Sequence, residues 1–229
     1  MTTFPLLVVL LPFAAAAAGL LVSRWRPGRP PTTTTGTKRA AWIAILPTAA
    51  AAVLAAWLAW TPGFSYFTHT TTPAAPTGQT YGTIITGGVP ISLTLQADAL
   101  SAVLGVLVTL VALAVQIYSV GYLEDDPRYP SYSAFISLFT SAMLLVVYAG
   151  DLLVLYVGWE IMGLCSYLLI GHWWEDRGNS RAAIKAFLVT RLGDVGFLFG
   201  IFVLGMGGRA VSASPTSWRR CPRCPRRRS

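Results

Sequence analysis

Charged side chains are scarce in this sequence. Of 229 residues only 11% are charged, with 17 Lys or Arg and 9 Asp or Glu, while 54% are hydrophobic. A soluble globular domain carries about 25% charged residues, so this composition excludes an ordinary soluble protein. It also excludes a disordered chain, because disordered chains are poor in apolar residues. The class that fits is a membrane protein with several spans.

The last segment of the chain lacks acidic residues altogether. Residues 209–229 hold seven basic residues and no acid, whereas residues 1–208 hold ten bases and nine acids, a net charge of +1 out of the total of +8. The positive charge therefore belongs to a short tail, and the rest of the chain is almost neutral.

Cysteine and histidine are too few for a structural metal site. The tail has one Cys-x-x-Cys pair, Cys221 and Cys224, and no second pair or histidine accompanies it. A structural zinc ion needs four protein ligands, so we expect no metal. The arginines of the tail lack interleaved aromatic residues and a recognisable nucleic-acid fold, so we also expect no nucleic-acid partner.

Long apolar stretches dominate what is present. Six of them are long enough, or nearly so, to cross the bilayer, which needs about 20 helical residues. They lack the alternation of barrel strands, so helices are expected. The predicted fold is an all-α, polytopic membrane bundle of about six transmembrane helices. The spans lie at 4–22, 41–60, 99–119, 133–149, 151–172 and 183–206.

Basic loops set the predicted orientation. The loop 23–40 carries five basic residues and the loop 173–182 carries two, so the positive-inside rule places both in the cytoplasm. The loop 120–132 then also lies inside, and the N-terminus lies outside. No basic residue precedes the first apolar stretch, so we interpret it as a retained helix and not as a signal peptide.

The chain is expected to have four parts. Residues 1–62 form two transmembrane helices joined by a basic cytoplasmic loop. Residues 63–97 form an exoplasmic segment, in which strand-forming runs around Gly87 and Gly88 favour a hairpin. Residues 98–208 form four further helices, and residues 209–229 form the basic tail, which we expect to be disordered.

Ionisable residues interrupt the last two spans. Glu160 lies near the middle of the fifth span, and Arg191 and Asp194 lie around the middle of the sixth. Charges inside the bilayer are costly and usually mark an ion or proton path. We therefore take these three residues as candidates for proton translocation, together with Lys185, which lies about 13.5 Å of helix rise from Asp194.

Each candidate also has a purely structural interpretation. Arg191 and Asp194 are three residues apart and would form a neutral packing pair on one helix face. Glu160 would be a protonated carboxyl whose charge is disfavoured by burial, and Lys185 would extend to the interface as an anchor. His172 lies at the end of the fifth span beside two tryptophans, and the aromatic belt explains it. Two glycines flank Glu160 and favour close helix approach. They are Gly158 and Gly163.

From Val120 to Leu204 the sequence resembles the L (ND5-type) subunit of respiratory complex I, the proton-pumping NADH:quinone oxidoreductase, and the likeness extends from about residue 91 to 206. The segments that carry it are SVGYLEDDPRYPSY, LLVLYVGWEIMGLCSYLLIGHWW and AAIKAFLVTRLGDVGFLFGIFVL. The resemblance implies an antiporter-like bundle of inverted repeats, of which this chain carries a part.

The resemblance also implies which reactions take place on this chain and which on other subunits. It places no redox reaction and no cofactor on this chain, because NADH, FMN, iron–sulfur clusters and quinone would belong to the rest of the complex. The implied partners are the lipid bilayer and the other membrane subunits of complex I, especially a neighbouring antiporter-like subunit. The implied location is the bacterial plasma (inner) membrane.

Residue roles follow from the motif match alone. Glu160 of GWE takes the place of the coupling carboxylate, which in the family pairs with a lysine on a broken helix two spans later. Asp194 and Arg191 of TRLGD take places in the buried polar network near it. No intramembrane lysine follows Asp194 here. We further expect the tail to be out of register with the family's reading frame, as in a truncated or frameshifted product.

Two other functions fit the same features. One is the A subunit of a multisubunit sodium/proton antiporter, which shares the bundle and the membrane glutamate. The other is a membrane fragment with no transport of its own.

Overall fold

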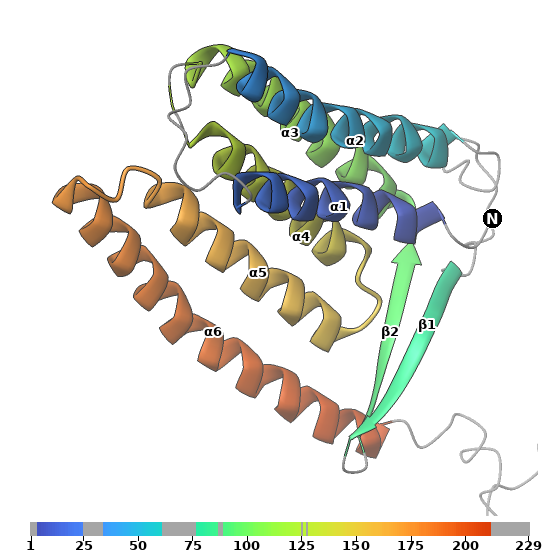
Figure 1. Ribbon diagram of the computed structural model, residues 1–229. Helices are drawn as coiled ribbons and strands as arrows, with labels where there is room; N and C mark the ends of the chain where they lie inside the picture. The colour runs from blue at the N-terminus through green and yellow to red at the C-terminus, as the bar shows by residue number, and fades with distance from the viewer. Residues whose placement is uncertain are drawn as a thin grey trace, which may run out of the picture. The chain divides into compact units, whose positions relative to one another are not determined.

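The computed structural model of the chain describes residues 4–24, 34–60, 77–86, 89–124, 126 and 128–211. Within these ranges lie six helices and a two-stranded sheet (Figure 1). Two compact parts are formed, by residues 1–190 and by residues 191–229. The elements are α1 (Phe4–Arg24), α2 (Thr34–Trp60), β1 (Thr77–Thr86), β2 (Val89–Ala97), α3 (Ala99–Tyr122), α4 (Tyr129–Tyr148), α5 (Leu152–Ile170) and α6 (Arg177–Val211).

The helices confirm the all-α membrane class. Five of them, α2 to α6, contain stretches that are long and apolar enough to cross a membrane by length and composition. The first, α1, has a shorter apolar stretch from Pro5 to Leu21. The expected six helices are therefore all present among the described residues. The apolar stretch of α1 falls at the lower limit of length for a crossing helix.

Local side-chain chemistry explains where the central helices begin. The Asp98 carboxylate accepts a hydrogen bond from the Ser101 N–H, and the Ser101 hydroxyl accepts one from the Asp98 N–H, which is a complete capping box at the start of α3. At α4 the sequence placed the start at residue 133, but the helix begins at Tyr129. Pro130 is tolerated in the first turn because no intrahelical N–H is needed there.

The last helix is longer than the sixth predicted span at both ends. α6 begins at Arg177, six residues before the predicted start, and ends at Val211. It therefore includes the first three residues that the sequence assigned to the tail, which contain neither Gly nor Pro to interrupt the hydrogen-bond ladder. The remainder of the tail, residues 212–229, lies outside the described residues, so its predicted disorder and origin stay predictions.

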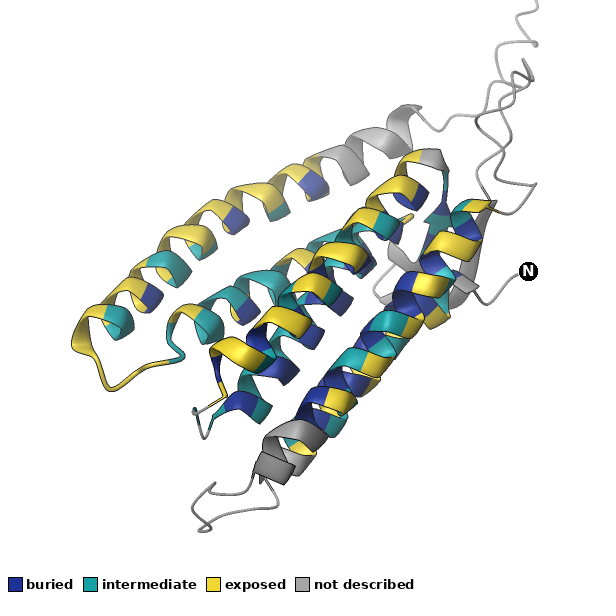
Figure 2. Cartoon of the chain, turned by 90° about the horizontal axis from the view of Figure 1, so that it is seen from above, coloured by how far each residue is buried: buried dark blue, intermediate teal, exposed yellow. Residues whose placement is uncertain are grey.

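Helices α1 to α5 pack side by side in the first compact part. α4 contacts α1, α3 and α5, while α2 packs on α1 and α3. Buried residues line the facing sides of these helices and exposed residues line their outer sides (Figure 2). On α3 the outer side carries large apolar residues, namely Leu100, Val103, Leu107 and Leu110. An apolar outer face is what a helix in contact with lipid requires.

Polar side chains join the helices inside this bundle. The amide of Gln116 on α3 is fully buried and donates to the Ser133 carbonyl at 3.1 Å and to the Ser137 hydroxyl at 3.0 Å, both on α4. The Ser141 hydroxyl of α4 donates to the Val9 carbonyl of α1 at 2.9 Å. Such bonds between transmembrane helices contribute about 0.6 kcal/mol each on average, so their main effect is to fix which faces meet.

The two strands form an antiparallel hairpin whose first pair at the open end is Thr77 with Ala97 and whose last is Thr86 with Val89. Gly87 and Gly88, around which the sequence favoured a hairpin, lie outside the described residues. The hairpin is fixed to the bundle through β2, because the Gly150 N–H donates to the Thr94 carbonyl at 2.8 Å. The segment between α4 and α5 is therefore held by the sheet.

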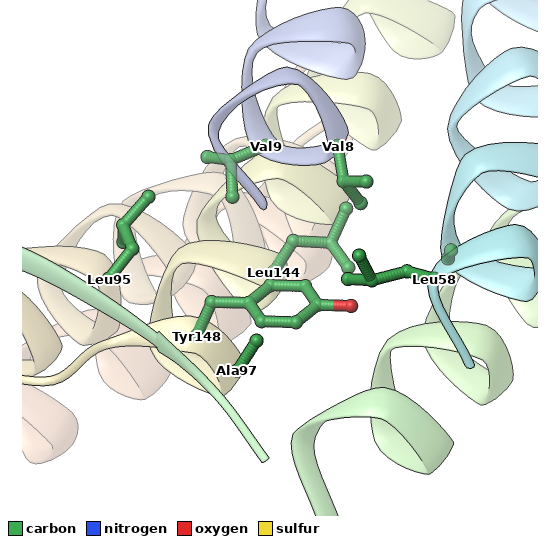
Figure 3. Close-up of a cluster of buried hydrophobic side chains, with 8 residues drawn as sticks. Val8, Val9, Leu58, Leu95, Ala97, Leu144 and Tyr148 are labelled. Carbon is green, nitrogen blue, oxygen red and sulfur yellow. The ribbon is translucent and has the colours of Figure 1, made fainter. Parts of the chain in front are cut away.

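A cluster of eight buried residues joins β2 to the helices (Figure 3). Its largest member is Tyr148, whose side chain is fully buried at the end of α4. The Tyr148 hydroxyl has no hydrogen-bond partner in the part of the chain that the structure describes. It lies against Gly105 of α3, where any side chain would overlap the hydroxyl. Gly105 is therefore required for this contact.

We expect Gly105→Ala to lower the free energy of unfolding by about 1–3 kcal/mol, the usual cost of overpacking a filled core. Gly121→Ala is the matched control, because Gly121 lies on the same helix with open space around it and alanine gains up to about 1 kcal/mol in helix propensity. Adding Tyr148→Phe to Gly105→Ala should restore most of the loss. Unfolding by SDS in mixed micelles, followed by circular dichroism, measures all three, and equal effects at Gly105 and Gly121 would contradict the prediction.

Candidate functional site

Glu160 is the ninth residue of α5, a helix of 19 residues that carries no other charge. The Asp151 carboxylate caps the start of this helix by accepting from the Leu153 N–H at 2.7 Å. Gly171 ends it, with its N–H bonded to the carbonyls of the last turn. The sequence thus fixes Glu160 halfway along an apolar helix, at the depth of the bilayer centre if α5 spans it.

Gly158 determines which way Glu160 faces. A Cβ built at Gly158 would lie 2.8 Å from a methyl of Val146 and 3.2 Å from the Ala142 carbonyl, both on α4. The close helix approach predicted at Gly158 is therefore confirmed. Two residues correspond to about 200° of rotation around a helix, so Glu160 lies on the face of α5 that points away from α4. It shares that face with Val157 and Leu164, and Glu160 itself is half-buried.

We expect Gly158→Ala to push α5 away from α4, because two of the three nearest atoms belong to the α4 backbone and cannot rotate aside. The expected loss in the free energy of unfolding is about 1–3 kcal/mol, measured by SDS titration in mixed micelles. Val146→Ala removes the nearest methyl and should recover only part of it. A loss no larger than that of the control Gly121→Ala would contradict the close approach.

The beginning of α6 covers the Glu160 face of α5 near its C-terminal end. Tyr167, which is two turns after Glu160 and so on the same face, contacts Phe187 of α6 with ring centroids 5.2 Å apart. A cavity of about 250 Å³ opens beside Tyr167, lined by residues of both helices, Ala183 and Ile184 of α6 among them. Lys185 follows these two lining residues and its side chain is exposed.

The second compact part contains the other predicted pair. The Arg191 guanidinium lies 3.8 Å from the Asp194 carboxylate, one turn along α6. Asp194 is buried, with 7% of its surface exposed. The structure thus brings Arg191 and Asp194 together as the sequence expected. Whether they conduct protons or only pack stays a prediction, as do the roles of Glu160 and Lys185.

A second polar cluster was missed by the sequence analysis. The His172 Nε2 lies 2.9 Å from an Asp126 carboxylate oxygen, and both side chains are about nine-tenths buried. The Arg128 guanidinium lies 3.7 Å from Asp126 and 3.6 Å from Glu175. His172 is therefore more than an aromatic-belt residue. The sequence did contain one indication of this contact, because the loop that carries Asp126 and the end of the fifth span, where His172 lies, were both predicted on the cytoplasmic side.

Asp126 is the member of this cluster whose pKa is shifted. Burial raises the pKa of the Asp126 carboxyl, but hydrogen bonds from the Arg128 N–H and from His172, together with the charges of His172 and Arg128, outweigh burial and leave the pKa below its ordinary value of 3.8. Because the pKa of Asp126 is lower in the folded chain than in the unfolded chain, its ionised carboxylate stabilises the fold at pH values above the pKa of the unfolded chain. This stability is lost as the pH falls through the pKa of the folded chain. Asp126 is therefore ionised at neutral pH.

No group of three or more His, Cys, Asp or Glu side chains is placed to hold a metal ion within the described ranges. The expectation that the chain binds no metal or cofactor stays a prediction.

Two family descriptions match the sequence. Residues 149–210, which hold Glu160, Lys185, Arg191 and Asp194, match the family described as NADH:quinone oxidoreductase/Mrp antiporter, transmembrane. Residues 84–133 match the family described as NADH-ubiquinone oxidoreductase (complex I), chain 5 N-terminus. The two matches together include α3, α5 and nearly all of α6.

Curated relatives agree with these two family descriptions. NADH-quinone oxidoreductase subunit L of Neisseria meningitidis is 35% identical over 201 residues, 87% of this chain and 27% of that protein. F(420)H(2) dehydrogenase subunit L of Methanosarcina mazei is 50% identical over 107 residues, 47% of this chain and 16% of that protein. The chain thus spans less than a third of the length of these relatives.

A solved structure shares the fold. It is that of the membrane-bound sulfane sulfur reductase (MBS), an archaeal respiratory membrane complex, and one of its chains superposes with a TM-score of 0.62 at 18% identity. The match covers 88% of this chain and 28% of that one. The helical bundle is therefore a partial antiporter-like fold.

Proposed function

Since this chain belongs to the L (ND5-type) family of antiporter-like membrane subunits, and covers an N-terminal part of its members, we propose that it takes part in proton translocation within a membrane-bound NADH:quinone oxidoreductase. The observation that carries the proposal is the position of Glu160, at the middle of an apolar helix, half-buried and facing away from α4. A carboxylate in that position exchanges a proton only if another group stabilises its charge.

The roles of the residues follow from this geometry. Glu160 takes up and releases the proton. A group of opposite charge lowers the free-energy cost of the ionised carboxylate, and this group approaches from the face of α5 that α4 does not cover. Lys185, which is exposed on α6 and follows the cavity-lining residue Ile184 in sequence, serves proton entry. Arg191 and Asp194 contribute a pair of opposite charges to the buried polar network. No electron transfer takes place on this chain, and the redox cofactors belong to other subunits.

The proposed setting is a bacterial plasma membrane with the N-terminus outside. The basic residues in the segment between α1 and α2 and at the start of α6 support this orientation through the positive-inside bias. The proposed partners are the other membrane subunits of the oxidoreductase, among them a second antiporter-like subunit.

A copurification experiment combined with proton uptake tests the proposal. The chain is tagged at its own locus, the membranes are solubilised gently, and the bound proteins are identified by mass spectrometry. Inverted membrane vesicles are then assayed for acidification driven by NADH, with and without the gene. We expect quinone oxidoreductase subunits in the eluate and a loss of acidification without the gene. Recovery of the chain alone together with unchanged acidification would refute the proposal.

The family description that matches residues 149–210 also names Mrp antiporters, which keeps a sodium/proton antiporter as the second candidate. The match of residues 84–133 to the chain 5 N-terminus favours the oxidoreductase. Proton flux that depends on sodium and not on NADH would reverse this order.

A further inference from the structure

The Asp126–His172 contact joins two connections that are 46 residues apart in sequence. Asp126 lies in the short link between α3 and α4, and His172 follows the end of α5. Their side chains are 10% and 9% exposed, and the atoms in contact are 2.9 Å apart. A buried bond of this length between a carboxylate and an imidazole is a specific link and not a chance surface contact.

Several groups face His172 from the elements around it. Asp126 faces it from the α3–α4 link, and Tyr132 of α4 contacts its ring edge-on at 5.3 Å. Trp173 also contacts the His172 ring edge-on, with ring centroids 5.6 Å apart. Arg128 binds both Asp126 and the exposed Glu175 of the α5–α6 connection, so the charges of the cluster nearly balance.

The opposite end of α5 is also fixed. The Gly150 N–H is bonded to the Thr94 carbonyl of β2, and Ala149 forms a bridge with Leu95. Asp151 then caps the helix. α5 is thus held at its start by the hairpin, along its length by Gly158 against α4, and at its end by Asp126 through His172.

We propose that Asp126 and His172 are a positioning pair that fixes the C-terminal end of α5, and with it Glu160. The link to Glu160 rests on the proposed function, whereas the link to α5 does not. The contact is suited to this role because a hydrogen bond to an ionised carboxylate is stronger than one between neutral groups.

The chain supplies its own probe for the position of α5. Cys165 is fully buried on α5, one and a half turns before its end. With Cys221 and Cys224 replaced by serine, Cys165 is the sole thiol, because the sequence has three cysteines. Its rate of reaction with a membrane-permeant maleimide, divided by the rate in the denatured chain at the same pH, reports how firmly α5 is held.

The test compares His172→Gln, Asp126→Asn and the swapped pair Asp126→His/His172→Asp in native membranes. His69→Gln, which makes the same change at the other histidine of the chain, is the control. Both single variants should label Cys165 at least about tenfold faster, the change expected for one lost hydrogen bond to a charged group. The swapped pair should restore slow labelling, and the control should not differ from the unaltered chain.

Acidification of vesicles driven by NADH is measured on the same variants beside Glu160→Gln. Labelling of Cys165 that is unchanged by either single variant, or that stays fast in the swapped pair, overturns the positioning pair whatever the acidification. Faster labelling with normal acidification, while Glu160→Gln abolishes it, overturns the link to Glu160 and leaves the proposed function standing. Faster labelling while Glu160→Gln also acidifies normally supports the positioning of α5 and refutes the role proposed for Glu160 instead.

Discussion

Glu160→Gln is expected to reduce NADH-driven acidification of membrane vesicles to the level of a strain without the gene. Glutamine has almost the same shape and keeps a hydrogen-bonding side chain, but it neither binds nor releases a proton. Because Glu160 is the only acidic residue among the 19 residues of α5, no neighbour on that helix can replace it as a proton carrier. Assembly with the other subunits should not change, since α5 is held by its cap, by Gly158 and by His172, and not by the charge of Glu160.

Two variants sharpen the result. Glu124→Gln makes the same chemical change at an exposed residue after the end of α3 and should leave acidification normal. Glu160→Asp keeps the carboxyl but withdraws it by one methylene, so it should retain a measurable fraction of the activity. NADH oxidation is measured in the same vesicles to separate proton transport from electron transfer. Normal acidification with Glu160→Gln, in membranes shown to contain the variant, would remove Glu160 from the proton path.

The sequence was sufficient for the number and kind of helices, because span length is dictated by the thickness of the hydrocarbon layer. It was less successful at helix ends. α4 and α6 extend past the apolar stretches, at Tyr129 and at Arg177, because backbone hydrogen bonding continues into polar residues until something interrupts it. Hydropathy measures where a helix meets lipid and not where it ends.

The candidate site was predicted in part for the same reason. Glu160, Arg191 and Asp194 were conspicuous because a charge in an apolar run is costly, and the Arg191–Asp194 pair was readable from its spacing of three residues. The Asp126–His172 contact could not be read in that way, since it joins distant segments and depends on how α3, α4 and α5 end. The direction of Glu160 likewise required the close contact between Gly158 and Val146.

The pair formed by Arg191 and Asp194 provides the other large expected effect. Removing one charge of a buried ion pair costs about 3–5 kcal/mol, because the remaining charge loses the group that faced it. Asp194→Leu should therefore lower the free energy of unfolding, measured by SDS titration in mixed micelles, by about 3 kcal/mol.

The double variant Arg191→Met/Asp194→Leu distinguishes packing from conduction. Replacing both members of a buried pair by apolar residues of similar volume is often neutral or stabilising, so the double variant should recover most of the stability lost in Asp194→Leu. If the pair only packs, acidification driven by NADH recovers together with stability. If Asp194 carries protons, acidification stays low in a stable protein, and Arg191→Lys, which keeps the positive charge beside Asp194, retains more of it than the double variant does. A double variant as unstable as Asp194→Leu would show that the two side chains do not act as a pair.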